Sequence, residues 1–342
     1  MQISVPTASP ILIAPTAAFH HACVAKEIIT QPKKIPMRKR GWSVEHHGAN
    51  IHVVKIERPR CSMDFEHWIL LMADNHVDST ASRLDIERKL LDEALRRDAS
   101  ICFIGDTLDL MSHKNDPRHT KGGLRRELLS DGYFDKIIDM AAKHYAPYAS
   151  HVVMWGVGNH ESNYLKRMET CPTTNLVRAI KGMAETDAIA GGYGGWIRFQ
   201  IKLGGQGRSY TVKYMHGGGG SAAMTGGTLD SKRVFSWLEG VDSLVYSHLH
   251  TSNIVGLQRL YLCDKNGKFE EKQRYTDCIR IGTTKDAWGK TGGAFGFEVE
   301  RQFGPAPLRQ KWIRLRIEWE TKRDGTQLRG SPKLVWDVMD AF

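Results

Sequence analysis

Five short apolar runs in this chain each end in a polar segment, and this repeated arrangement constrains the fold more than any other feature. The polar segments are Asp74-Asn75-His76, Gly105-Asp106-Thr107-Leu108-Asp109, Gly158-Asn159-His160-Glu161, His216-Gly217 and Ser247-His248-Leu249-His250. The apolar runs have the length of buried strands. In an α/β sheet the carboxyl ends of the strands line one edge, where ligands bind. We therefore expect the five segments to converge on one crevice.

The predicted secondary structure places these runs in an α/β fold. In the first half, strands predicted at 51–56, 67–73, 101–104 and 151–157 alternate with helices predicted at 83–97 and 133–145. Such alternation favours a mostly parallel sheet with helices on its faces. The second half is richer in predicted strands, which lie at 196–203, 209–216, 241–246, 275–283, 294–299 and 315–320, with a hairpin loop at 204–207. We expect this half to supply a second sheet.

Length and composition favour one large domain that follows an N-terminal extension. The chain has 342 residues, of which 41% are hydrophobic and 25% are charged, as in ordinary globular proteins. We expect residues 1–50 to form a partly irregular extension, because the stretch 32–40 is basic and contains proline. Residues 51–342 are expected to form a single domain, with the polar segments in a core at 67–252 and further strands at 270–342.

Cysteine usage and charge bear on location and partners. No stretch approaches the length of a membrane span, and the start lacks a signal-peptide pattern. Six cysteines are scattered without a C-x-x-C pair, which indicates reduced thiols in the cytoplasm, and Cys102 is expected to be a buried core thiol. The net charge of +10 favours a nucleic acid or nucleotide partner, or it serves solubility alone. We expect no membrane partner, and the sequence leaves the oligomeric state open.

The residue types in the five segments fit a site for two metal ions. Aspartate, histidine and asparagine supply oxygen and nitrogen ligands suited to manganese, iron or zinc. Two ions roughly 3.5–4 Å apart need one carboxylate that bridges both. Because side chains alternate along a strand, Asp74 and His76 would share a face, and His248 and His250 would do the same.

Each segment is weak evidence when it is taken alone. A lone histidine after a strand is more often structural than a ligand, and Asp109 alone would more often be a helix cap or a turn residue. Residues 217–220 are four glycines, but no Gly-Lys-Ser/Thr follows them, which excludes a P-loop. The ordered set of five segments, each at the end of an apolar run, is what favours a metal site.

This ordered set resembles the calcineurin-like metallophosphoesterases, whose pattern is D-x-H, G-D-x-x-D, G-N-H-D/E, H and G-H-x-H. The resemblance covers residues 74–250, just over half of the chain. Together with the predicted elements, it implies a four-layer αββα sandwich of two mixed sheets flanked by helices. It also implies that Asp74, His76 and His250 hold one ion, and that Asp106 bridges the two ions.

The resemblance assigns roles to the remaining residues of the pattern as well. Asn159, His216 and His248 would hold the second ion. His160 would not be a ligand; it would lie beside the substrate and stabilise or protonate the leaving oxygen. Asp109 would act with it by orienting a ligand or His160.

The chain departs from the family pattern at a few positions. Ser247 stands where glycine is usual, which we expect to alter backbone freedom more than ligation. Glu161 is a common variant. Leu110-Met111 replaces the Arg-Gly of protein Ser/Thr phosphatases, and no tyrosine stands at a ligand position of the purple acid phosphatase kind. The layout looks most like phage and bacterial phosphoesterases.

The expected chemistry is hydrolysis of a phosphate ester. Two divalent ions would lower the pKa of a bridging water, and the resulting hydroxide would attack phosphorus in line, with the leaving oxygen on the side of His160. The ions would also offset the charge of the transition state. Manganese is our first choice of metal, with zinc, iron, nickel and cobalt as alternatives.

The substrate class depends on the basic loop at 112–126. Its cations are Lys114, Arg118, Lys121, Arg125 and Arg126. Arg118, Lys121, Arg125 and Arg126 either contact substrate phosphates or form a solvated surface. Our first choice is a phosphodiesterase such as a nuclease, and the alternative is a phosphomonoesterase acting on nucleotides or small phosphates. A binding scaffold that had lost catalysis would lack residues of the pattern, and none is missing here. Should His160 not be the acid, His113 and His119 of this loop are the next candidates.

Overall fold

The computed structural model describes residues 33–62, 64–112, 115–116, 122–218, 228–288, 304–319 and 332–341. The chain divides into residues 1–33 and residues 34–342, and every described helix and strand lies in the second unit. The strand predicted at 294–299 lies outside the described residues. Across the described ranges, no helix combines the length and apolarity that crossing a membrane requires.

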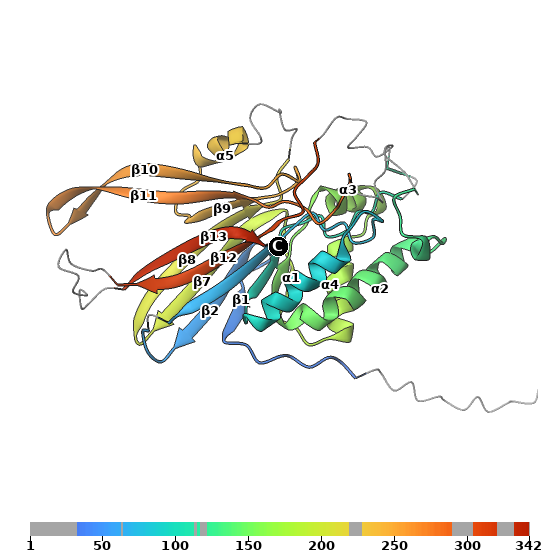
Figure 1. The fold of residues 1–342 in the computed structure, drawn as a ribbon, viewed down its shortest axis with the longest axis horizontal. Helices are drawn as coiled ribbons and strands as arrows, with labels where there is room; N and C mark the ends of the chain where they lie inside the picture. The colour runs from blue at the N-terminus through green and yellow to red at the C-terminus, as the bar shows by residue number, and fades with distance from the viewer. Residues whose placement is uncertain are drawn as a thin grey trace, which may run out of the picture. The chain divides into compact units, whose positions relative to one another are not determined.

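Residues 34–342 form an α/β fold with two mixed sheets (Figure 1). The six-stranded sheet has the order β13 (Lys333–Ala341), β12 (Gln310–Glu318), β3 (Glu66–Met72), β4 (Ser100–Phe103), β5 (Val152–Trp155) and β6 (Ile189–Ala190). The seven-stranded sheet has the order β1 (Trp42–His46), β2 (Ile51–Arg58), β7 (Gly194–Leu203), β8 (Gln206–Met215), β9 (Ser243–Tyr246), β11 (Lys268–Arg280) and β10 (Asn253–Lys265). β3 to β6 are parallel neighbours, and so are β8, β9 and β11.

The helices lie mainly beside the six-stranded sheet. They are α1 (Leu84–Arg96), α2 (Tyr133–Tyr145), α3 (Asn159–Met168), α4 (Pro172–Met183) and α5 (Thr228–Phe235), with 3₁₀ turns η1 (Arg126–Leu128) and η2 (Ala146–His151). α1 shows why these segments are helical: Leu90, Leu91 and Ala94 recur at helical spacing and are buried. Its acidic first turn and basic last turn complement the helix dipole.

The cores explain why the central strands read as continuous apolar runs. In β3, Leu70 and Met72 belong to the core formed with the helices, whereas Ile69 and Leu71 belong to the core between the two sheets. A strand that is buried on both faces needs apolar side chains at every position. A smaller core, which includes Phe235 and Leu238, packs at the end of α5 on the seven-stranded sheet.

The structure confirms the α/β class, and it corrects the assignment of chain halves to sheets. The seven-stranded sheet begins with β1 and β2 from the first half, while β12 from the end of the chain pairs with β3 and β13 pairs with β12 at the edge of the same sheet. The second face of the parallel strands is therefore covered by the other sheet, not by helices. β1 also lies within residues 1–50, which we expected to form an extension.

Candidate metal centre

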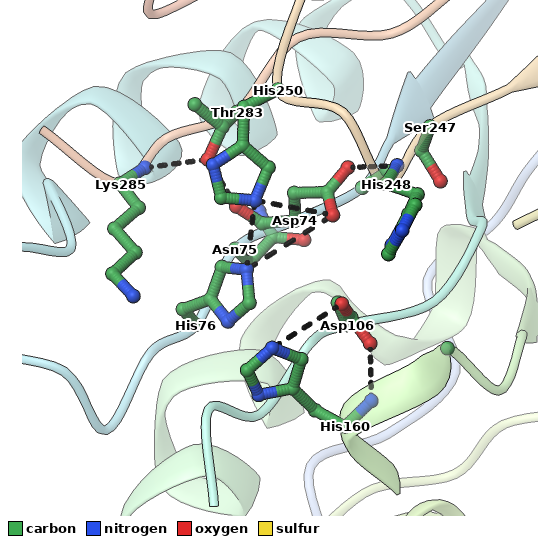
Figure 2. A network of polar contacts seen from close by, with 12 residues as sticks. Asp74, Asn75, His76, Asp106, His160, Ser247, His248, His250, Thr283 and Lys285 are labelled. Atoms are coloured by element: carbon green, nitrogen blue, oxygen red, sulfur yellow. Dashed lines mark hydrogen bonds and ion pairs between the residues drawn. The ribbon is translucent and has the colours of Figure 1, made fainter. Parts of the chain in front are cut away.

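The five polar segments meet at the carboxyl ends of β3, β4, β5, β8 and β9. The polar segments begin within three residues of the strand ends, which are Met72, Phe103, Trp155, Met215 and Tyr246. Figure 2 shows the side chains of four of the segments facing one another. Among the described residues, three groups of side chains have ligand atoms close enough to hold a metal ion. The seven expected ligands, together with His160 and Asp109, all lie in or against these groups. These nine are called the site residues below.

The first group contains Asp74, His76 and His250. Nε2 of His76 lies 3.2 Å from Nε2 of His250, and Oδ1 of Asp74 lies 3.5 Å from the His250 nitrogen and 4.0 Å from the His76 nitrogen. Oδ1 of Asp74 is buried and accepts no hydrogen bond from the described residues. A bound cation would satisfy this oxygen and both nitrogens, so the donor set fits a metal ion.

The second group contains Asp106, His216 and His248, with Asn159 between the two rings. Oδ1 of Asn159 lies 3.0 Å from Nε2 of His216 and 2.7 Å from Nδ1 of His248. The same His216 nitrogen lies 3.2 Å from Oδ2 of Asp106. On its other side, Nδ1 of His216 lies 3.1 Å from the carbonyl oxygen of Ile104. A carbonyl can only accept, so that nitrogen carries the proton and the neutral ring has its lone pair at Nε2.

The third group joins Asp109 to His76 and His160. Nδ1 of His76 lies 3.0 Å from Oδ1 of Asp109, while its Nε2 faces the first group. One ring can therefore serve the first group with one nitrogen and contact Asp109 with the other, which is the usual arrangement behind a histidine ligand. Nδ1 of His160 lies 2.5 Å from the main-chain carbonyl of Asp109. Asp109 thus orients two histidines, one through its side chain and one through its main chain.

The backbone of the centre is unusual. Of the nine described non-glycine residues with positive φ, five belong to the first two groups. They are Asp74, His76, Asp106, His248 and His250. Left-handed backbone costs roughly 1–3 kcal/mol per residue and is retained mainly where function requires it. The expected strand alternation is therefore wrong here: left-handed turns aim these side chains, and His248 and His250 point into different groups.

Two glycines allow the segments to approach one another closely. Gly105 has a φ of 105°, and a Cβ atom there would lie 2.7 Å from the main-chain nitrogen of Gly158. A Cβ atom on Gly158 would lie only 2.0 Å from Oδ1 of Asp106. A larger residue at Gly158 would therefore displace Asp106, and one at Gly105 would displace Gly158 or the ring of His216.

Glu161 and the start of α3 hold this close approach together. The carboxylate of Glu161 accepts hydrogen bonds from the main-chain nitrogens of Gly158 at 2.8 Å, Asp106 at 3.1 Å and Leu108 at 3.0 Å. The main-chain nitrogen of His160 in turn donates to Oδ1 of Asp106 at 2.9 Å. A carboxylate at a helix N-terminus is favoured by the dipole and by the unpaired N–H groups.

The electrostatics of the centre favour a cation. Burial opposes ionisation of Asp106, but the neighbouring histidines hold its pKa well below the ordinary value. Burial also works against a charged His216, yet the carboxylates of Asp106, Asp74 and Glu161 raise its pKa to about 9. Burial, followed by the charge of Asp106, raises the pKa of Glu161 to about 8. The buried acids therefore attract positive charge, whether a proton or a metal ion.

A sixth segment, which was not among the five expected from the sequence, follows β11. Thr283 and Lys285 lie beside Asp74 and His76 (Figure 2). Oγ1 of Thr283 donates to the carbonyl of Asp74 at 2.6 Å, and Nζ of Lys285 donates to Oδ1 of Asp109 at 3.1 Å. The end of the predicted strand 275–283 was a usable signal, because β11 runs parallel to β9 and ends at the same edge.

Ser247 does more than the sequence suggested. Its Oγ lies 2.8 Å from Nδ1 of His216 and donates to the carbonyl of the same residue at 3.0 Å. The substitution of serine for glycine therefore touches a candidate ligand directly, so the expectation that it would act through backbone freedom was incomplete.

The described part of the basic loop includes Arg125 and Arg126. Lys114, Arg118 and Lys121 lie outside the described residues, as do His113 and His119. Arg125 is partly buried and donates to the carbonyls of Val77 and Ser82 at 2.8 and 2.9 Å. Arg126 is exposed in η1.

Comparison with known proteins adds no relative, since no protein-family model and no curated protein matches this chain.

Proposed function

We propose that this protein is a phosphoesterase that works with two divalent metal ions and has the αββα architecture of the calcineurin-like metallophosphoesterases. The observation that carries the proposal is the pair of ligand groups at one sheet edge, built largely from residues with left-handed backbone. The order of the segments along the chain supports the same family. Two groups in contact suit a paired site better than a single structural ion.

In this proposal the two groups hold one ion each. Asp74, His76 and His250 would hold the first, and Asn159, His216 and His248 would hold the second. Asp106 would bridge the two ions; its Oδ2 lies beside His216, and its Oδ1 accepts a hydrogen bond from the main chain at the start of α3. When bound, two divalent ions would supply a water of lowered pKa and would neutralise phosphate charge. Manganese is our first choice of metal.

His160 acts as the proton donor to the leaving oxygen. Because the carbonyl of Asp109 can only accept, Nδ1 of His160 carries a proton in either charge state of the ring. The exchangeable position is therefore Nε2, which lies 3.8 Å from Oδ2 of Asp106, on the metal side of the ring. The side chain is 13% exposed, so a substrate can reach it. A positioned acid of this kind contributes roughly 10²–10⁴-fold.

The substrate is proposed to be a phosphodiester, with nucleic acid as first choice. The net charge of +10 supports a polyanionic substrate in the cytoplasm. The second candidate is a monoesterase acting on nucleotides or small phosphates.

The test is a substrate screen with metal-reconstituted protein. The protein is stripped with chelator, loaded with manganese, zinc or iron, and assayed on a chromogenic monoester, the matching diester, and single- and double-stranded DNA and RNA. We expect metal-dependent hydrolysis that is lost in Asp106→Asn. Activity that survives both metal removal and this substitution, or no hydrolysis of any ester by protein carrying two ions, would refute the proposal.

A further inference from the structure

We propose that Lys285 is a positioning residue of the metal centre, acting through Asp109. Its ammonium group donates to Oδ1 of Asp109, the same oxygen that lies 3.0 Å from Nδ1 of His76. The main-chain carbonyl of Asp109 lies against Nδ1 of His160. One lysine therefore holds the residue that orients both a proposed ligand and the proposed acid. The roles of His76 and His160 rest on the proposed function, but the contact chain does not.

Lys285 is held in place by a segment that is tied to the loop after β3. Beside the bond from Thr283 to the carbonyl of Asp74, Oγ1 of Thr284 donates to Oε1 of the buried Glu87 at 2.8 Å. The main-chain nitrogen of Arg83 donates to the carbonyl of Thr284 at 3.0 Å. Because these hydrogen bonds hold the two residues before Lys285, the side chain of Lys285 reaches Asp109 from a backbone position that is fixed.

The burial of the pair separates it from an ordinary surface ion pair. The side chain of Lys285 is 18% exposed and that of Asp109 is 10% exposed. Exposed pairs contribute little, because water screens them and the side chains stay mobile. In a partly dry pair the lysine fixes which oxygen of Asp109 faces His76, and changes to such supporting residues typically cost about 10–100-fold in activity or metal affinity.

The test combines a double-mutant cycle with a readout that needs no turnover. Lys285→Met, Lys285→Arg, Asp109→Asn and the Asp109→Asn/Lys285→Met double variant are compared with wild type. Lys311→Met is the matched control, because Lys311 forms a partly buried ion pair with Asp340 away from the nine site residues. Turnover is measured on an ester with a poor leaving group, and histidine-ring ¹H–¹⁵N spectra of the metal-free protein report the tautomer of His76.

We expect Lys285→Met to lower kcat about tenfold with a smaller change in KM, and Lys285→Arg to recover most of the loss. The double variant should be no slower than Asp109→Asn within about twofold, because both changes break one chain of contacts. The Nδ1–H signal of His76 should be sharp in wild type and exchange-broadened in Lys285→Met.

Three results would overturn the proposal. The first is turnover and ring spectra of Lys285→Met that match those of wild type. The second is a further tenfold loss of turnover when Lys285→Met is added to Asp109→Asn. The third is a loss of turnover in the Lys311→Met control equal to that in Lys285→Met. If the wild type hydrolyses no ester, the proposed function fails, and the ring spectra alone decide the role of Lys285.

Discussion

The two ligand groups of the centre are built differently. The side chain of His216, in the second group, is fully buried, and Ile104 and Ser247 fix its ring from behind. His250, in the first group, has a side chain that is 21% exposed, and its neighbour Asp74 leaves one oxygen without a hydrogen bond from the described residues. Donors that are fixed in advance bind an ion with less ordering cost. We therefore expect the second ion to be held tightly and the first to exchange more readily.

The largest expected effect comes from removing one histidine from each group. His216→Ala should abolish the second ion and lower activity by more than the roughly 10–100-fold that is typical of a supporting residue, because it removes a buried proposed ligand. His250→Ala should weaken only the first ion, so excess metal should restore part of the activity by mass action. Metal content after gel filtration measures the loss of each ion. Activity as a function of metal concentration measures the recovery. Equal loss in both variants at every metal concentration would remove the contrast between the groups.

His160 separates chemistry from metal binding. His160→Gln should keep both ions and the fold, and should lower kcat by roughly 10²–10⁴-fold on an ester with a poor leaving group. The loss should shrink on a good leaving group, which needs little protonation. Loss of metal comparable to His216→Ala would instead make His160 a ligand, as its place in the third group allows.

Ser247 sharpens the comparison at the level of a single hydroxyl group. Ser247→Ala and Ser247→Gly both remove the contact to His216, but only the glycine variant adds backbone freedom. If ring orientation matters, both should weaken the second ion by about tenfold. Metal titration of each variant provides the measurement. A loss confined to Ser247→Gly would assign the effect to the backbone instead.

The smallest expected effects lie outside both groups, at the end of the basic loop. Arg126→Gln should weaken a polyanionic substrate by only a few-fold, and this loss should fade as salt rises. Arg125→Gln should instead lower the free energy of unfolding by roughly 1–3 kcal/mol, because two carbonyls lose their donor. The KM for the substrate at two salt concentrations tests Arg126→Gln, and thermal unfolding tests Arg125→Gln. Equal behaviour of the variants would show that neither arginine has the environment described.

The convergence of the five polar segments could be predicted because its signals are local. An apolar run such as β3 and the polar residues that follow it can be recognised without knowing what packs against them. The pairing of β12 with β3 cannot, since the partners lie about 240 residues apart and no local pattern specifies the contact. Lys285 was missed for the same reason, because it meets Asp109 from 176 residues away.

Backbone conformation was the other limit on what the sequence could show. Positive φ is uncommon for any residue other than glycine, even though aspartate and histidine adopt it more often than most, so strand alternation was the natural expectation at Asp74 and His76. The close approach of Gly105 to Gly158 beside Asp106 is likewise visible only in the assembled segments.

Metal stoichiometry tests the two-ion centre most directly. Wild-type protein and Asp106→Asn are saturated with manganese, freed of excess metal by gel filtration, and analysed for metal and protein content. We predict two ions per chain in wild type and at most one in Asp106→Asn, because Asp106 is the carboxylate proposed to bridge the groups. One ion or none in saturated wild-type protein would contradict the account.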